Sequence, residues 1–129
     1  MKSSVRITQL SLILFLSGLL VSLTAPSIEQ KLIGQWELVK MKGGHMSKND
    51  KGERLEFKSD GTVYALKNTS DKKLEAKFIG KWEADEESME LIIYERNGRE
   101  EDMEILKITD KKLVLSERKG KEIHLKKVK

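Results

Sequence analysis

The sequence predicts an all-β fold, a small eight-stranded antiparallel up-and-down barrel with a short helical turn before it. Short apolar-rich runs alternate with turn residues at about the 8–12-residue spacing that is typical of sandwiches and barrels. Asp60-Gly61 and Asn97-Gly98 are dipeptides that favour tight hairpins. The connections are too short for Greek-key crossings, so an open sheet would have two raw edges. Closure of eight strands would remove those edges and leave an interior for side chains or for one small ligand.

The first 25 residues have the pattern of a secretory signal peptide. Two basic residues precede an apolar run between Leu10 and Leu23, and small residues follow as far as Ala25. A membrane-spanning helix usually needs about 20 apolar residues, and this run is shorter. We therefore expect a signal peptide at 1–25, one folded domain at 26–129, and membrane contact only through the signal segment if it stays uncleaved.

The composition limits the compartment and the partners. The chain has no cysteine, which excludes thiol enzymes and cysteine zinc sites and indicates a bacterial envelope or secreted protein, either periplasmic or released. Without the first 25 residues, 23 basic and 21 acidic residues remain, and they are interspersed. Interspersed charge is typical of a solvated surface, so nucleic-acid binding is not expected.

The first element of the domain is predicted to be one or two turns of helix. Ser27 can cap its start, and Gln30 completes a capping box. Ile28 and Leu32 are four residues apart and share a face. Gly34 ends the turn, so the chain passes directly into the first strand.

Strands are predicted wherever apolar and polar residues alternate between turn residues. These runs lie at 34–41, 54–59, 62–68, 74–84, 89–96, 100–109, 113–119 and 122–128. The clearest inward residues are Leu55, Phe57, Met89, Leu91, Ile93, Leu113, Leu115, Ile123 and Leu125.

Two runs change face midway. Trp36 and Leu38 give way to Val39 and Met41, which have the opposite parity. In the later run, the apolar residues likewise change from odd positions, Met103 and Ile105, to even positions, Leu106 and Ile108. Such changes predict β-bulges, which closed barrels need in order to bend.

The phrase Ile-Gly-x-Trp-Glu occurs at 33–37 and again at 79–83, and it holds both tryptophans of the chain. A glycine in a strand lets the backbone approach a neighbouring strand closely. The tryptophan two residues later can then turn inward and fill the base of the barrel. We interpret the repeat as a packing device, and the structural residues it predicts are Gly34, Trp36, Gly80 and Trp82.

Four phrases resemble the small bacterial lipocalin-like domains, a group of calycin-type barrels. They are Leu32-Ile33-Gly34-Gln35-Trp36, the aromatic strand and turn LEFKSDGTV, Gly80-Lys81-Trp82, and ITDKKLVLS near the end. The phrases occur in this order, and the resemblance as a whole spans about residues 28 to 128. The resemblance implies a lipocalin-like barrel that is not an enzyme. Animal lipocalins place an arginine late in the barrel against the first tryptophan. Arg118 and Lys126 fit that place equally well here, so the role is not assigned to either.

The apolar interior is the feature with functional potential. For this exported domain, the resemblance implies a pocket that binds a small hydrophobic ligand, which would enter past the 43–52 loop. The residues proposed to line its site are Leu55, Phe57, Tyr64, Met89, Leu91 and Ile93. The alternative is a filled core, in which case the barrel would act as an interaction module for an envelope protein partner. Both interpretations fit the sequence.

No pattern for catalysis, metal binding or a cofactor is present. His45 and Asp50 share a loop but lack a second histidine at zinc-ligand spacing, and His124 alternates with inward residues and should face solvent. The acidic runs at 86–87 and 100–102 lie at predicted turns and strand ends, where they indicate surface charge. We therefore expect no enzyme, no metal and no cofactor.

Overall fold

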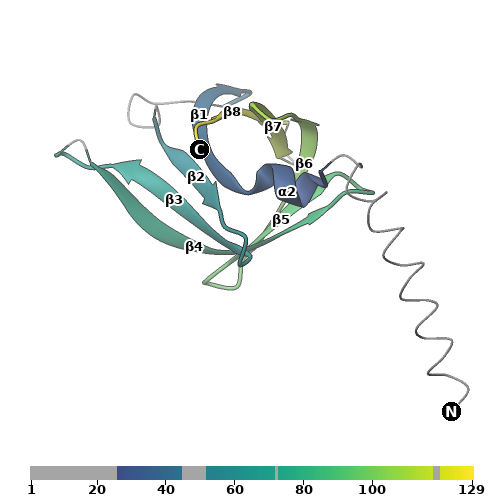
Figure 1. The fold of residues 1–129 in the computed structure, drawn as a ribbon, viewed down its shortest axis with the longest axis horizontal. Helices are drawn as coiled ribbons and strands as arrows, with labels where there is room; N and C mark the ends of the chain where they lie inside the picture. The colour runs from purple at the N-terminus through teal and green to yellow at the C-terminus, as the bar shows by residue number, and fades with distance from the viewer. Residues whose placement is uncertain (1–25, 45–51, 72, 118–119) are drawn as a thin grey trace, which may run out of the picture.

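The computed structural model describes residues 26–44, 52–71, 73–117 and 120–129 (Figure 1). The predicted signal peptide and residues 45–51, which make up most of the predicted entry loop and include His45 and Asp50, lie outside these ranges. Arg118 also lies outside them. The elements of the described residues are α2 (Ile28–Leu32), β1 (Gly34–Lys42), β2 (Arg54–Phe57), β3 (Thr62–Asn68), β4 (Leu74–Asp85), β5 (Glu90–Glu95), β6 (Glu100–Ile108), β7 (Lys112–Glu117) and β8 (Glu122–Lys127).

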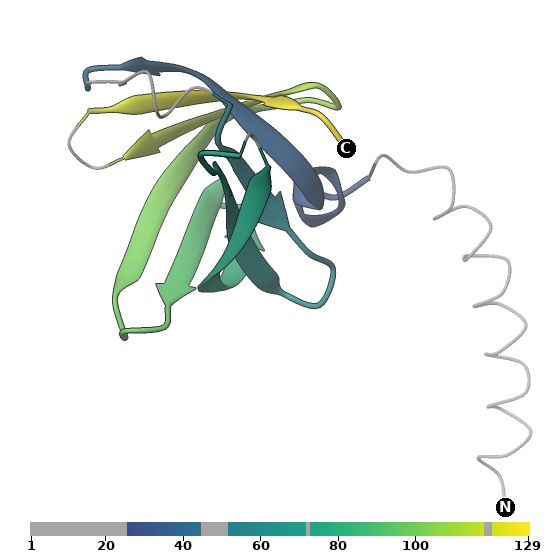
Figure 2. The same ribbon diagram turned by 90° about the vertical axis from the view of Figure 1, so that its left-hand side faces the viewer.

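The strands close into a barrel in simple sequence order. Each strand pairs antiparallel with the next, and β8 pairs with β1 to complete the ring (Figures 1 and 2). The predicted fold class, an eight-stranded antiparallel up-and-down barrel, is confirmed. Within the described residues, no helix is long and apolar enough to cross a bilayer.

The N-terminal helix forms for the reasons read from the sequence. The Ser27 hydroxyl accepts a hydrogen bond from the Gln30 backbone N–H at 3.3 Å, and the Gln30 side chain accepts one from the Ser27 N–H at 3.2 Å. Ile28 and Leu32 are buried on the shared face. That face packs against β4 and β6, so α2 covers the end of the barrel where β1 begins.

The two predicted bulges are present. The β1–β8 register shifts between Leu38 and Lys40, and the β6–β7 register shifts between Ile105 and Lys107. The skipped residues point outward, so Val39 is 51% exposed and Leu106 is 46% exposed. The change of face therefore takes effect after the bulge, and the predicted inward positions of Val39 and Leu106 are wrong.

Candidate functional site

The barrel interior is packed at the end that α2 covers. Its most deeply buried side chains, each less than 2% exposed, are Leu32, Trp36, Phe57, Val63, Leu91 and Leu113. Leu115 is equally buried but lies toward the other end of the barrel. Aliphatic and aromatic side chains at this density exclude water and supply most of the hydrophobic stabilisation.

Trp36 is held from two sides at this packed end. Its indole Nε1 donates a hydrogen bond to the carbonyl oxygen of Leu32 at 2.8 Å, which ties β1 to α2. The Lys127 ammonium lies 5.1 Å from the centre of the Trp36 ring, within the range of a cation–π interaction. The same ammonium donates to the carbonyl oxygens of Lys31 and Ile33, at 3.0 and 2.7 Å. Lys127 thus caps the free carbonyl groups at the end of α2.

The cation beside the first tryptophan is therefore Lys127, which the sequence analysis did not consider. Lys126 points outward and forms an ion pair with Glu37 at 3.2 Å. Strand alternation could have identified Lys127, because it has the same parity as the inward Ile123 and Leu125.

The second Gly-x-Trp phrase joins β4 to its neighbours. The Trp82 ring meets Phe57 edge to face at 5.4 Å, and its Nε1 donates to the carbonyl oxygen of Lys58 at 3.1 Å. Gly80 is buried, and a Cβ there would clash with the carbonyl oxygen of Tyr94 on β5. Gly34 has a positive φ of 133°, and a Cβ there would clash with the backbone near the C-terminus.

The end of the barrel opposite α2 holds an open cavity of about 430 Å³. Its floor is apolar and includes Leu55, Ala65, Ile79, Ile93, Leu115 and Ile123. Its rim is charged: Lys67 lies on β3, Lys77 on β4, and Glu95, Glu101 and Glu117 lie on β5, β6 and β7. Arg96 follows β5, and its guanidinium lies 6.0 Å from the centre of the Phe78 ring. A second space of about 160 Å³ shares Leu55, Ala65 and Ile123 and extends toward Met41 on β1.

Comparison with known families decides the identity of this barrel. The sequence model of the lipocalin-like domain matches residues 32–115. The chain belongs to the lipocalin-like domain family.

Two solved structures share the fold of this lipocalin-like protein. An uncharacterized protein from Bacteroides eggerthii superposes with a TM-score of 0.61 at 16% identity, covering 75% of this chain and 99% of that chain. A lipocalin-like protein from Bacteroides uniformis gives a TM-score of 0.60 at 18% identity, covering 76% and 99%. No curated protein matches the sequence.

The predicted ligand residues of this lipocalin-like barrel fall into three places. Leu55 and Ile93 line the cavity. Phe57 and Leu91 are inside the barrel but lie in the packed half, at 1% and 0% exposure. Met89 occupies the β4–β5 turn with a positive φ of 53°, so it also lies at the packed end, away from the cavity.

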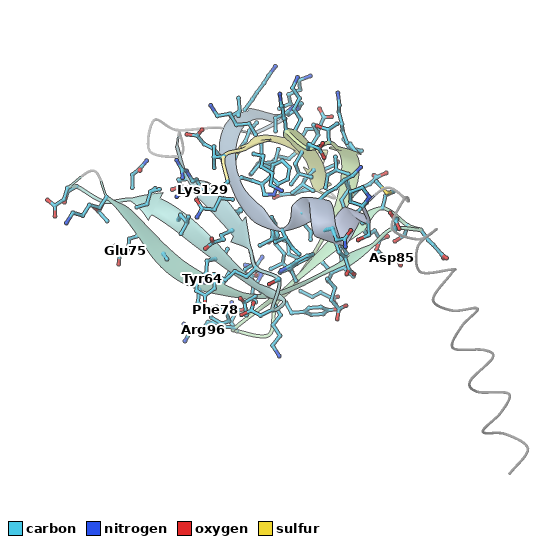
Figure 3. All side chains as sticks on the ribbon, viewed as in Figure 1. Tyr64, Glu75, Phe78, Asp85, Arg96 and Lys129 are labelled. Atoms are coloured by element: carbon cyan, nitrogen blue, oxygen red, sulfur yellow. The ribbon has the colours of Figure 1, made fainter. Side chains whose placement is uncertain are left out.

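Tyr64 is on the outer face, and its predicted place in the interior is wrong. It alternates with Val63, which is fully buried in the core, and with Ala65, which lines the cavity. Its ring instead meets Phe78 at 5.3 Å and lies 4.5 Å below the Lys58 ammonium (Figure 3). The strand TVYALKN has apolar residues at both odd and even positions, so alternation alone does not decide which set faces inward. Tyr64 belongs to the set that faces outward.

The three inward carboxylates are the site residues that sequence reasoning missed. Glu101 belongs to an acidic run that is predicted to be surface charge, and Glu100 and Glu101 are indeed exposed, whereas Asp102 is half-buried. Glu101 nevertheless lies at the rim of the cavity. Glu101 has the parity of the buried Met103 and Ile105, so alternation places it inside. Burial is the main cause that raises the pKa of the Glu101 carboxyl.

In the described part of the lipocalin-like barrel, the remaining features are the lack of a metal-binding group of side chains and the position of His124. Among residues 26–44, 52–71, 73–117 and 120–129, no group of three or more His, Asp or Glu side chains could hold a metal ion. His124 faces outward between Val114 and Lys40, as predicted, but it is half-buried and not fully solvated.

Proposed function

We propose that this lipocalin-like protein is a non-enzymatic binding protein that holds one small, largely apolar ligand in the cavity opposite α2. The observation that carries the proposal is the division of the interior. In one half, the side chains are packed closely enough to exclude water. The other half contains a cavity of about 430 Å³ above a floor of apolar side chains. A space of this size falls within the roughly 300–1,000 Å³ that small-molecule sites occupy.

The division also separates folding from binding. The residues that bury the most surface lie beside α2, so the fold does not depend on filling the other half. An apolar ligand would cover the half-buried Leu55, Ile79 and Ile123 from water and gain the free energy of that burial. The alternative of a filled core that acts only through its surface is less well supported, because half of the interior is open.

Ala65 provides a direct test, because it lines both spaces. An Ala65→Phe substitution should place a ring in the cavity and weaken binding of a neutral probe such as decanol at least about tenfold, as measured by calorimetry. The matched control is Ala76→Phe on the same sheet, where Ala76 is exposed and pairs with Leu66. Equal affinity in Ala65→Phe and wild type would refute a ligand site in this cavity.

We further propose that the protein acts outside the cytoplasm, in the periplasm or as a secreted protein. The proposal rests on the basic start, the apolar run and the small residues of positions 1–25. N-terminal sequencing of the protein isolated from its host tests it: the mature chain should begin between about residues 22 and 27. A cytosolic chain that still begins at Met1 would contradict export.

A further inference from the structure

We infer that the outer wall formed by β6, β7, β8 and β1 docks on a membrane surface that contains anionic phospholipid, with Val39 and Leu106 entering the layer of lipid headgroups. The contact lies outside the cavity, so it does not depend on the proposed ligand. It also does not depend on whether residues 1–25 stay attached.

The two β-bulges place the same pair of residue types on this wall. Each bulge carries an aliphatic residue followed by a lysine, Val39-Lys40 on β1 and Leu106-Lys107 on β6. Val39 is 51% exposed, Leu106 is 46% exposed, and both lysines are exposed. In a regular strand, one residue of each pair would point into the barrel. The bulges therefore keep an aliphatic side chain and a cation together on the outside.

The two pairs lie at the ends of one row across four neighbouring strands. Lys40 pairs with His124 on β8, His124 pairs with Val114 on β7, and Val114 pairs with Lys107 on β6. These strands are consecutive in the closed ring (Figures 1 and 2). Val114 and His124 are half-buried, so the middle of the row is less exposed than its ends. We call this row the bulge patch; it consists of Val39, Lys40, Leu106, Lys107, Val114 and His124.

The charge around the bulge patch is complementary to an anionic surface. On the side toward α2, Lys112 on β7 lies directly opposite Lys126 on β8, and like charges in facing positions are unfavourable. Lys126 has an ion pair with Glu37, but the ion pairs between described residues include neither Lys112 nor the two lysines of the bulge patch. Three cations of this wall therefore lack a neutralising carboxylate within the described part of the chain.

The other acidic residues of this wall lie on the side toward the cavity. Glu122 on β8 is paired with Lys42 on β1, and Glu104 on β6 is paired with Ser116 on β7. Both positions are one step farther from α2 than the bulge patch. An anionic surface would therefore contact the bulge patch and the side toward α2, and these two carboxylates would face away from it.

A lipid surface fits the bulge patch better than another protein does. Lysine is depleted at protein interfaces, whereas exposed lysines beside aliphatic side chains are typical of contacts with anionic membranes. The outer wall of a barrel is convex, and a fluid lipid layer can follow that shape. A second copy of this chain fits poorly, because a two-fold axis along or across the strands would bring Lys40 against Lys107 or Lys40 of the other copy, where like charges repel.

The lack of cysteine allows one fluorescent dye to be attached at one chosen position. The full chain is labelled with an environment-sensitive dye after Val39→Cys, Leu106→Cys or, as a control, Leu74→Cys, since Leu74 on β4 is 40% exposed outside this wall. Each is titrated with vesicles of equal parts phosphatidylglycerol and phosphatidylcholine. Emission should shift to the blue at positions 39 and 106 and much less at 74. Vesicles of phosphatidylcholine alone should give a smaller shift.

Removal of the lysines tests the charge argument in the labelled Leu106→Cys chain. Lys40→Gln combined with Lys107→Gln should raise the lipid concentration at half of the shift about twentyfold, because each lysine near an anionic surface contributes a factor of about five. Lys73→Gln combined with Lys81→Gln is the matched control. It removes the same charge from exposed positions beside and on β4, and it should have a much smaller effect.

Each outcome decides for or against the docking surface. Equal shifts at positions 106 and 74, or no shift at any position, would overturn the inference. Equal effects of the two lysine pairs would overturn it too, because the attraction would then come from net charge alone. A blue shift that grows with protein concentration without vesicles would mean that a second copy covers the wall. The labelled Val39→Cys chain gives the same comparisons if Leu106→Cys alters the melting temperature, and none of these results affects the ligand site.

Discussion

Trp36 connects three parts of the molecule through one side chain. Its ring is fully buried, its Nε1 binds the carbonyl oxygen of Leu32, and its face lies beneath the Lys127 ammonium. The helix, the first strand and the last strand therefore meet at this residue. The Gly-x-Trp phrase is thus a closing device for the barrel, and nothing in it contacts the cavity.

Removing Trp36 should unfold the protein or nearly so. Trp36→Ala would leave a large void beside α2, and comparable losses cost about 3–5 kcal/mol, a large part of the stability of a small domain. Trp36→Phe should cost less, because it keeps most of the packing and loses the hydrogen bond. Thermal denaturation measures both, and a melting temperature for Trp36→Ala within a few degrees of wild type would rule out this role.

Lys127 and Lys126 form a matched pair of neighbouring lysines with different contacts. Lys127→Met should destabilise the protein by about 1–3 kcal/mol, because two carbonyl groups and the Trp36 ring lose a charged partner. Lys126→Met should cost less than about 1 kcal/mol, because it removes an exposed ion pair with Glu37. Urea denaturation of both variants checks the difference, and equal costs would be the contradicting result.

Glu101 predicts a dependence of stability on pH. The folded state raises the pKa of this carboxyl, mainly through burial and then through Glu117 and Glu95, with Arg99 and Lys121 opposing. The folded state therefore binds the proton more readily, so this group contributes stability at low pH that is lost as pH rises through the raised pKa.

Glu101→Gln should accordingly be more stable than wild type near neutral pH, with the advantage shrinking as pH falls toward about 5. Solvent screening keeps the effect small, because Glu101 is exposed on one side. Urea denaturation at the two pH values measures the difference. A variant that is less stable than wild type at neutral pH would show that the ionised Glu101 carboxyl does not destabilise the folded state.

At the scale of elements, Gly80 controls how closely β4 approaches β5. A methyl group there would meet the carbonyl oxygen of Tyr94, and only a shift of a whole strand could relieve the clash. Gly80→Ala should therefore destabilise the barrel by several kcal/mol, well above the cost of a surface substitution.

Gly98→Ala is the control for Gly80→Ala. Gly98 also has a positive φ, of 88°, but a Cβ there meets nothing within 4 Å. Its cost should be limited to the backbone strain of about 1 kcal/mol. Chemical denaturation of the two variants compares them, and a similar loss in both would mean that the approach of β4 to β5 is not the constraint.

Strand alternation explains what could be predicted at this scale and what could not. Parity and turn residues place the strands, the helix cap and the bulges at Val39 and Leu106, because these features depend on neighbours in sequence. The register shift between Val63 and Tyr64 in the β3–β4 pair was not predicted. Tyr64 was misplaced because its strand has apolar residues at both parities. The place of Glu101 at the rim of the cavity was not predicted, because its exposure fits surface charge and only its parity with Met103 and Ile105 points toward the barrel.

At the scale of the whole molecule, the decisive property is that one half of the barrel is packed and the other is open. Periodicity identifies inward residues but not the height at which each one lies, since height depends on the register around the closed ring. Leu91 and Ile93 are adjacent inward residues of β5, yet Leu91 lies in the packed half and Ile93 lines the cavity. The choice between a pocket and a filled core could therefore not be made from the sequence.

The ligand site can be located by methyl NMR spectroscopy of the isotope-labelled protein during titration with decanol. We predict saturable shifts of the Leu55, Ile93, Leu115 and Ile123 methyl groups, which line the cavity. The methyl groups of the packed half, such as Leu32, Leu91 and Leu113, should change little. Shifts confined to the exposed Val39 and Leu106, or no saturable shift at all, would contradict a ligand site inside the barrel.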